Sequence, residues 1–134
     1  MKNNNGLTRL SKNGQTVHEM SDWADMPLVG NLVGDTTPRE RFYRTFDTVI
    51  PQPTEVRAGI WEATEYSEKV TDYPFNEIVF VMEGSLSMLD ETGEEERFEA
   101  GDCFFIEKGF NGEWRQNSSV KIIHMTIDPK DGQS

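Results

Sequence analysis

Short β-type runs fill the chain from Phe42 onward, and turn-forming residues separate them. Aromatic and β-branched residues are frequent in these runs, which recur roughly every 8–12 residues. No amphipathic helical period of useful length interrupts them. The runs occupy residues 41–50, 55–63, 76–90, 96–100, 102–108, 112–116 and 120–127. This pattern predicts an all-β domain built as an antiparallel sandwich or barrel.

The segment before Phe42 has a different character. Residues 1–20 are rich in Asn, Gly, Ser and Lys, which predicts a flexible arm. Residues 37–40, which read TPRE, have a capping-box pattern with proline at the first helical position, so a short helix is predicted there. Because 134 residues fit one domain, we expect a single domain over residues 21–130, with a partly irregular N-terminal segment and a tail at residues 131–134.

Charge and cysteine content exclude several classes of partner. The formal net charge of −11 argues against nucleic acid, because phosphate binding needs a basic patch, and against an anionic membrane. The single cysteine, Cys103, excludes an intramolecular disulfide, and we expect it to be a small buried side chain. The N-terminus lacks the apolar run of a signal peptide, and no stretch reaches transmembrane length. We therefore expect a cytoplasmic protein.

The run NEIVFVMEG, residues 76–84, places a carboxylate at the head of five consecutive apolar residues. Side chains alternate along a strand, so Glu77 should share a face with Val79 and Val81. A carboxylate on such a face needs hydrogen-bond partners. It can then act as a general acid or base, or hold a polar ligand. The alternative is a strand-end carboxylate in solvent.

Two glycine-anchored patches resemble the motifs of the cupin superfamily. Six residues separate Glu77 from Gly84, as at the end of the first cupin motif, and Gly101 and Gly109 keep the spacing of the glycines in the second. Over residues 57–127 the chain resembles small single-domain cupins similar to ureidoglycine aminohydrolase and the ethanolamine-utilisation cupins. The resemblance implies an RmlC-like cupin jelly-roll β-barrel of two antiparallel sheets.

The same resemblance implies a metal held inside the barrel by three histidines and a glutamate, and this sequence departs from that set. The histidine positions fall on Thr71, Tyr73 and Gly112, so Glu77 is the one good ligand that remains. Firm sites for transition metals use several nitrogen, sulfur or oxygen ligands. We therefore expect no resident cofactor. The alternative is a weakly bound divalent metal at Glu77 and His124.

The candidate ligand-binding residues are polar and aromatic side chains in or near the matched motifs. They are Trp61, Thr71, Tyr73, Glu77, Trp114 and His124. Glu77 and Tyr73 are also the candidate acid and base. Aromatic side chains line cores and pockets alike, so core packing is the alternative for the tryptophans. A rim position is the alternative for Tyr73, and a structural role is the alternative for His124.

Three functions agree with these residues. The first is a cupin that binds a small polar metabolite, suited to a carboxylate beside aromatic faces. The second is a small cupin enzyme, which by resemblance would act on a carbon–nitrogen bond or isomerise a metabolite. The third is a degenerate structural or regulatory cupin. A homodimer is expected from the resemblance and because Phe80 and Met82, on the face opposite Glu77, need cover.

Overall fold

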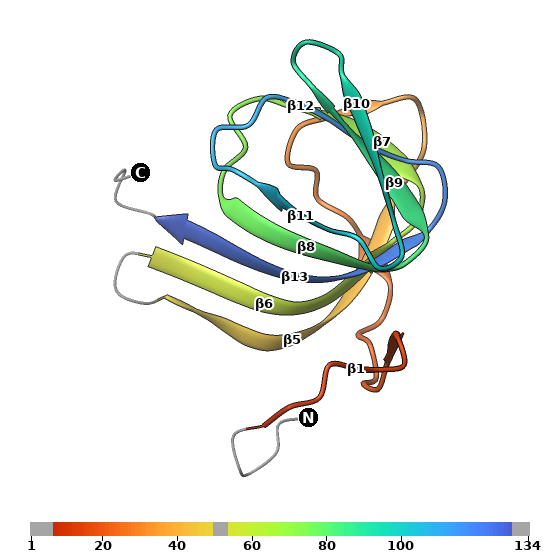
Figure 1. The fold of residues 1–134 in the computed structure, drawn as a ribbon, viewed down its shortest axis with the longest axis vertical. Helices are drawn as coiled ribbons and strands as arrows, with labels where there is room; N and C mark the ends of the chain where they lie inside the picture. The colour runs from red at the N-terminus through yellow and green to blue at the C-terminus, as the bar shows by residue number, and fades with distance from the viewer. Residues whose placement is uncertain (1–6, 50–53, 130–134) are drawn as a thin grey trace.

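The computed structural model describes residues 7–49 and 54–129, which form two facing antiparallel sheets and a small N-terminal hairpin (Figure 1). The larger sheet has the strand order β11 (Cys103–Ile106), β8 (Asn76–Glu83), β13 (Val120–Pro129), β6 (Thr54–Ala63), β5 (Arg39–Val49) and β3 (Ala24–Asp25). The smaller sheet has the order β10 (Glu95–Glu99), β9 (Ser85–Asp90), β12 (Gly112–Gln116), β7 (Tyr66–Val70) and β4 (Asn31–Val33).

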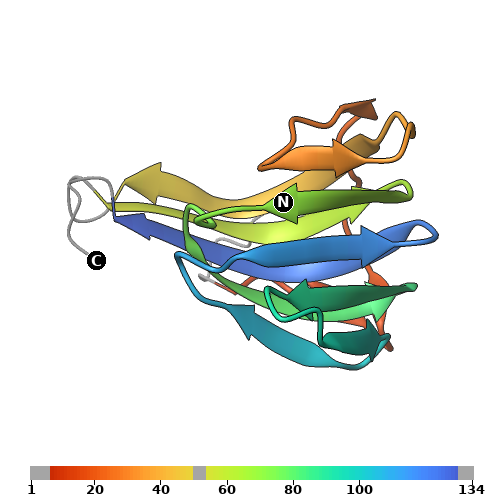
Figure 2. The same cartoon turned by 90° about the horizontal axis from the view of Figure 1, so that it is seen from above.

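This arrangement confirms the predicted all-β jelly roll of two antiparallel sheets. Seen from above, the strands of the five-stranded sheet overlie those of the six-stranded sheet (Figure 2). Among the described strands, no ladder joins the two sheets, so they form a sandwich that does not close into a hydrogen-bonded barrel. The described part of the chain contains no helix that could span a membrane.

Strand β8 shows how the sequence pattern builds the core between the sheets. Glu77 is 7% exposed, whereas its neighbour Ile78 is 45% exposed, and Val79 and Val81 are fully buried on the inner face. Burying an aliphatic side chain of this size stabilises the fold by roughly 1.5–3 kcal/mol. The predicted alternation along this strand, with Glu77 on the buried face, is therefore confirmed.

Gly84 lies where the chain leaves one sheet for the other, between β8 and β9. Its φ is +83°, and a Cβ there would lie 2.4 Å from the carbonyl oxygen of Ser119. A side chain at this position would therefore clash with the backbone and strain the turn. The glycine that the cupin motif places here is the residue that this sharp crossing requires.

The helix predicted at residues 37–40 is wrong. Strand β5 already begins at Arg39, whose backbone N–H donates to the Thr64 hydroxyl at 2.9 Å. In return, the backbone N–H of Thr64 donates to the Arg39 carbonyl at 2.9 Å. Thr64 directly follows β6, and Arg39 also pairs with Asp25 of β3, so tertiary contact overrides the local capping signal.

The buried position predicted for Cys103 is also wrong, because its side chain is exposed. Strand β11 is the edge of the larger sheet, and its inward positions belong to Phe104 and Ile106. Alternation therefore turns Cys103 and Phe105 outward.

The outer face of the larger sheet carries exposed apolar side chains. Phe105, Ile78 and Met125 lie side by side in the strand register, and Ile127 is exposed further along β13. Phe80 is partly buried on this face, whereas Met82 is buried. The homodimer expected from the resemblance stays a prediction.

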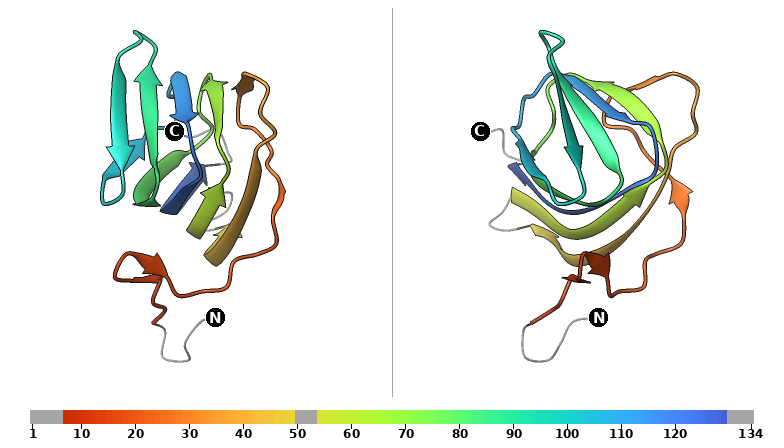
Figure 3. Two further views of the ribbon diagram at one scale, coloured as in Figure 1. Left: turned by 90° about the vertical axis from the view of Figure 1, so that its right-hand side faces the viewer. Right: turned by 45° about the vertical axis from the view of Figure 1, so that its right-hand side comes forward.

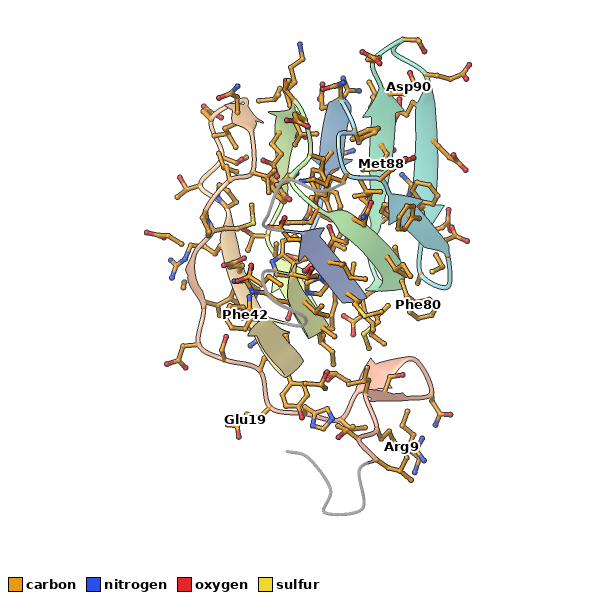
Figure 4. The ribbon with its side chains drawn as sticks, turned by 90° about the vertical axis from the view of Figure 1, so that its left-hand side faces the viewer. Arg9, Glu19, Phe42, Phe80, Met88 and Asp90 are labelled. Carbon is orange, nitrogen blue, oxygen red and sulfur yellow. The ribbon has the colours of Figure 1, made fainter. Side chains whose placement is uncertain are left out.

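The N-terminal hairpin, β1 (Ser11–Lys12) and β2 (Gln15–Thr16), lies apart from the two sheets (Figure 3). Arg9 and Glu19 lie on this segment, below the strands (Figure 4). The ring of His18 stacks on Tyr43 of β5, with centroids 4.0 Å apart, and its Nε2 contacts the Arg9 carbonyl. The remainder of the expected arm, residues 1–6, and the expected tail at residues 131–134 lie outside the described residues.

Candidate functional site

Three side chains form a continuous hydrogen-bonded chain inside the sandwich. The Tyr73 hydroxyl donates to Glu77 Oε1 at 2.6 Å, and His124 Nδ1 lies 3.0 Å from Glu77 Oε2. Glu77 stands opposite Thr126 in the ladder between β8 and β13, and His124 is two residues away on the same face. Because a carboxylate only accepts, Nδ1 carries the proton, and Nε2 is the ring nitrogen left for a ligand.

The turn before β8 fixes Tyr73 in place. Its backbone N–H donates to the Phe110 carbonyl at 3.0 Å, and its carbonyl accepts from the Gly109 N–H at 2.8 Å. The ring is buried and packs edge-to-face on Phe75. Burial, followed by the nearby charge of Glu77, raises the pKa of Tyr73 well above its ordinary value. The phenol therefore stays protonated at neutral pH and acts as a donor to the carboxylate.

The chain of Tyr73, Glu77 and His124 opens onto a cavity of about 200 Å³ between the sheets. Both sheets contribute to its walls. Met88, labelled in Figure 4, lines it from β9 of the smaller sheet. Thr126 lines it from β13 of the larger sheet. A space of this size holds a small molecule, and a mostly apolar cavity with a few placed polar groups is typical of ligand sites.

Aromatic side chains form much of the cavity wall. Trp114 lies at their centre, with its ring edge-to-face on Trp61 at 6.0 Å and stacked with Tyr66 at 6.5 Å. The Trp114 indole N–H donates to Gln116 at 2.9 Å, and the Trp61 indole N–H donates to Glu40 at 2.8 Å. Because both indole N–H groups have partners, both rings are held in place as parts of the cavity wall.

The structure places all but one of the predicted ligand-binding residues on this cavity. Trp61, Tyr73, Glu77, Trp114 and His124 line it, and they come from both sheets and from the turn before β8. Thr71 is exposed and lies outside the cavity. The binding and catalytic roles of these residues stay predictions.

A second buried carboxylate, Glu68, also faces the cavity and was missed in the sequence. It is 4% exposed, it accepts the Gly30 N–H at 2.7 Å, and it bonds the hydroxyl of Tyr66. Alternation along residues 66–70 places Tyr66, Glu68 and Val70 on one face, and that signal could have revealed it. Burial raises the pKa of Glu68, and the bonds from Gly30 and Val29 offset part of that rise.

This raised pKa predicts a pH-dependent cost of keeping Glu68 buried. The folded chain holds the Glu68 proton more tightly than the unfolded chain does, so the stability contribution of this group is fully present below the ordinary glutamate pKa. It is lost as the pH rises through the folded pKa. The free energy of unfolding of the wild type should therefore fall relative to that of Glu68→Gln as the pH rises from the ordinary glutamate pKa toward neutral pH.

Urea unfolding of both chains across this pH range measures the difference. The exposed Glu96→Gln serves as the matched control, and its difference from the wild type should stay nearly flat. A flat profile for Glu68→Gln would show that the buried carboxylate carries no such cost.

The residues at the implied metal position do not fit a tight metal site. Within residues 7–49 and 54–129, no three His, Cys, Asp or Glu side chains converge on one point. Both oxygens of Glu77 already accept hydrogen bonds, from Tyr73 and His124. Gly112, at the third histidine position, offers no ligand and lies against the Leu89 carbonyl. The donor set is therefore too small for the four-ligand site that the cupin pattern implies.

Comparison with known proteins agrees with the fold. The family model of EutQ-like cupin domains matches residues 52–122. A protein of unknown function in the DUF861 family, from Pseudomonas syringae, superposes with a TM-score of 0.70 at 18% identity over 82% of this chain. The chain spans only 45% of that protein's length. No curated protein matches.

Two further solved structures share the fold at lower similarity. The EutQ protein of Clostridium difficile has a TM-score of 0.55 at 22% identity, over 69% of this chain and 71% of its own. Ectoine synthase from P. lautus has a TM-score of 0.54 at 14% identity, over 78% of this chain and 69% of its own. Identities this low show a common fold, and they are no evidence about activity. The family match, which covers more than half of the sequence, goes further: this chain belongs to the family of EutQ-like cupin domains.

Proposed function

We propose that this chain binds a small, polar, amine-bearing molecule in the cavity between its two sheets, with no metal in the position that cupins use for one. The observation that carries this proposal is the buried chain of Tyr73, Glu77 and His124 on the wall of an aromatic cavity. A carboxylate accepts up to about four hydrogen bonds, so Glu77 keeps acceptor capacity beyond its two partners.

The surroundings of Glu77 favour a cationic group. A buried carboxylate is stabilised by an opposite charge, and an ammonium group brings both charge and donors. The faces of Trp61, Trp114 and Tyr66 add a cation–π attraction of roughly 0.5–2 kcal/mol. Glu40 and Glu68 also line the cavity and supply further acidic groups.

An enzyme is the second candidate, and one observation favours it. Glu77 holds His124 through Nδ1, which leaves Nε2 as the ring nitrogen that can accept a proton, and His124 lines the cavity. A histidine oriented by a carboxylate is a common general base. In that case Glu77 positions the base and Tyr73 positions Glu77. Turnover of a bound compound, followed by NMR, separates this candidate from simple binding.

The binding proposal predicts a thermal shift that depends on an amine and on Glu77. The probes are small amines paired with hydroxyl counterparts: ethylamine with ethanol, glycine with glycolate, and alanine with lactate. At least one amine should raise Tm by several degrees when its concentration is about 100 times its Kd, and its counterpart should not. Glu77→Gln should remove the shift, whereas Glu83→Gln, an exposed change on the same strand, should keep it.

Two outcomes would contradict the proposal. A full equivalent of transition metal in protein purified without chelator, lost in Glu77→Ala, would favour a metal-dependent cupin. The absence of any shift across the amine probes would favour the structural or regulatory role.

A further inference from the structure

The cavity contains positive as well as negative side chains, and the two kinds differ in depth. Glu68 and Glu77 are buried, at 4% and 7% exposed. Arg57 also lines the cavity, but its side chain is 37% exposed, and Arg44, which lines it as well, is exposed. The carboxylates therefore lie inside the sandwich, and the guanidinium groups lie toward solvent at the cavity mouth.

The strand register places Glu77, Arg57 and Arg44 in two neighbouring rows of the larger sheet, where a row is a set of residues that pair across adjacent strands. In one row, Thr126 of β13 stands between Glu77 of β8 and Arg57 of β6. Adjacent strands are about 4.8 Å apart, so the Glu77 and Arg57 backbones are separated by about 10 Å. Side chains of this length can reach opposite ends of one small molecule from that separation.

The next row also places a polar cavity residue and an arginine on either side of β6. Gly59 of β6 stands between His124 of β13 and Arg44 of β5. Because Gly59 has no side chain, the backbone of β5 packs directly against it: a Cβ there would lie 2.0 Å from the Tyr43 carbonyl oxygen and 2.8 Å from the Arg44 Cα. The two rows together bring one acidic residue, Glu77, and two basic residues, Arg44 and Arg57, to the same cavity.

Existing contacts orient both guanidinium groups. Arg57 Nη2 lies 3.3 Å from Glu55 Oε2, and the guanidinium carbon of Arg44 lies 4.3 Å from the ring centre of Phe42. A guanidinium group presents five N–H donors in a planar fork, which matches the two oxygens of a carboxylate.

We propose that the ligand is a small zwitterion of the amino-acid class. Its ammonium group lies against Glu77 and the aromatic wall, and its carboxylate lies against Arg44 and Arg57. This inference rests on the proposed function and extends it, since it assigns a role to the two arginines that line the same cavity. A zwitterion brings an ammonium group to the acidic side and a carboxylate to the basic side, so each charge of the ligand meets an opposite charge.

Neutralising the carboxylate of the probe tests this inference separately from the amine. The probes are glycine, alanine and β-alanine, each against its amide, in which the ammonium group is kept and the carboxylate charge is lost. Calorimetric titration of the intact chain should show at least one amino acid binding about tenfold or more tightly than its amide. That preference should fall to near unity in Arg44→Gln or Arg57→Gln. Arg97→Gln, an exposed arginine outside the cavity, should retain it.

The outcomes distinguish this inference from the proposed function. Equal affinity for an acid and its amide, with both lost in Glu77→Gln, would overturn the zwitterion and leave amine binding intact. Binding of amines in the absence of any amino-acid binding would overturn it too. An acid preference that survives in both arginine variants would also overturn it, because the carboxylate would then be recognised elsewhere.

Discussion

Replacing Trp114 by alanine is expected to lower the free energy of unfolding by about 3–5 kcal/mol. Trp114 is 6% exposed and lies in β12 of the smaller sheet. Its ring contacts Trp61 and Phe104 of the larger sheet and Tyr66 of its own, so it bridges the sandwich. Alanine would remove these contacts and leave a void in a core that closes around it only in part.

Equilibrium unfolding in urea, followed by far-ultraviolet circular dichroism, measures this loss without depending on tryptophan fluorescence. Trp23→Ala is the matched control, since Trp23 is 37% exposed and its ring lies beneath the guanidinium of Arg41. That change should cost no more than about 1 kcal/mol. A Trp114→Ala chain within about 1 kcal/mol of the wild type would mean that the ring lines the cavity without supporting the core.

The fold could be predicted because its signals are local and repeat along the chain. Period-two alternation set the inner face of β8, and the glycine at residue 84 marked the crossing between sheets. The two wrong predictions, the helix at residues 37–40 and the buried Cys103, have one cause. Both depend on strand pairing, which local sequence patterns do not reveal. Glu40 pairs with β6, and Arg39 pairs with β3 and hydrogen-bonds Thr64, so both residues become strand. Cys103 turns outward because β11 is an edge.

The candidate site could be predicted only in part. Glu77 was placed correctly on the buried face of its strand, since alternation is a property of one strand. His124 was named as a candidate, and it lines the cavity. Glu68 was missed because residues 66–70 were not predicted as a strand, and Arg57 was missed because only the folded sheet shows that its side chain lines the cavity. Thr71 was included through motif spacing alone, and its exposed position in the turn before β8 separates it from the cavity.

Gly59→Ala is expected to destabilise the fold by about 3 kcal/mol or more, because β5 passes unusually close to this residue. A Cβ at residue 59 would lie 2.0 Å from the Tyr43 carbonyl oxygen and 2.8 Å from the Arg44 Cα. Both atoms belong to the backbone, so no side chain can rotate away to make room. The β5 strand would have to shift, at the point where its register is already irregular between Arg44 and Phe46.

Urea unfolding of Gly59→Ala against Gly93→Ala separates this close approach from a general effect of replacing glycine. Gly93 has a φ of +89°, but a Cβ on this residue would meet no atom within 4 Å. Its replacement should therefore cost only about 1–2 kcal/mol of backbone strain. Equal costs for the two variants would show that β5 can move freely.

The same shift should reach the ligand site, because β5 carries Glu40 and Arg44 to the cavity. If Gly59→Ala remains folded, moving Arg44 away from its row with His124 should reduce the preference for amino acids over their amides. Gly93→Ala, in the turn between β9 and β10, should leave that preference unchanged. A folded Gly59→Ala chain with the full preference would show that recognition of the carboxylate does not depend on how closely β5 packs on β6.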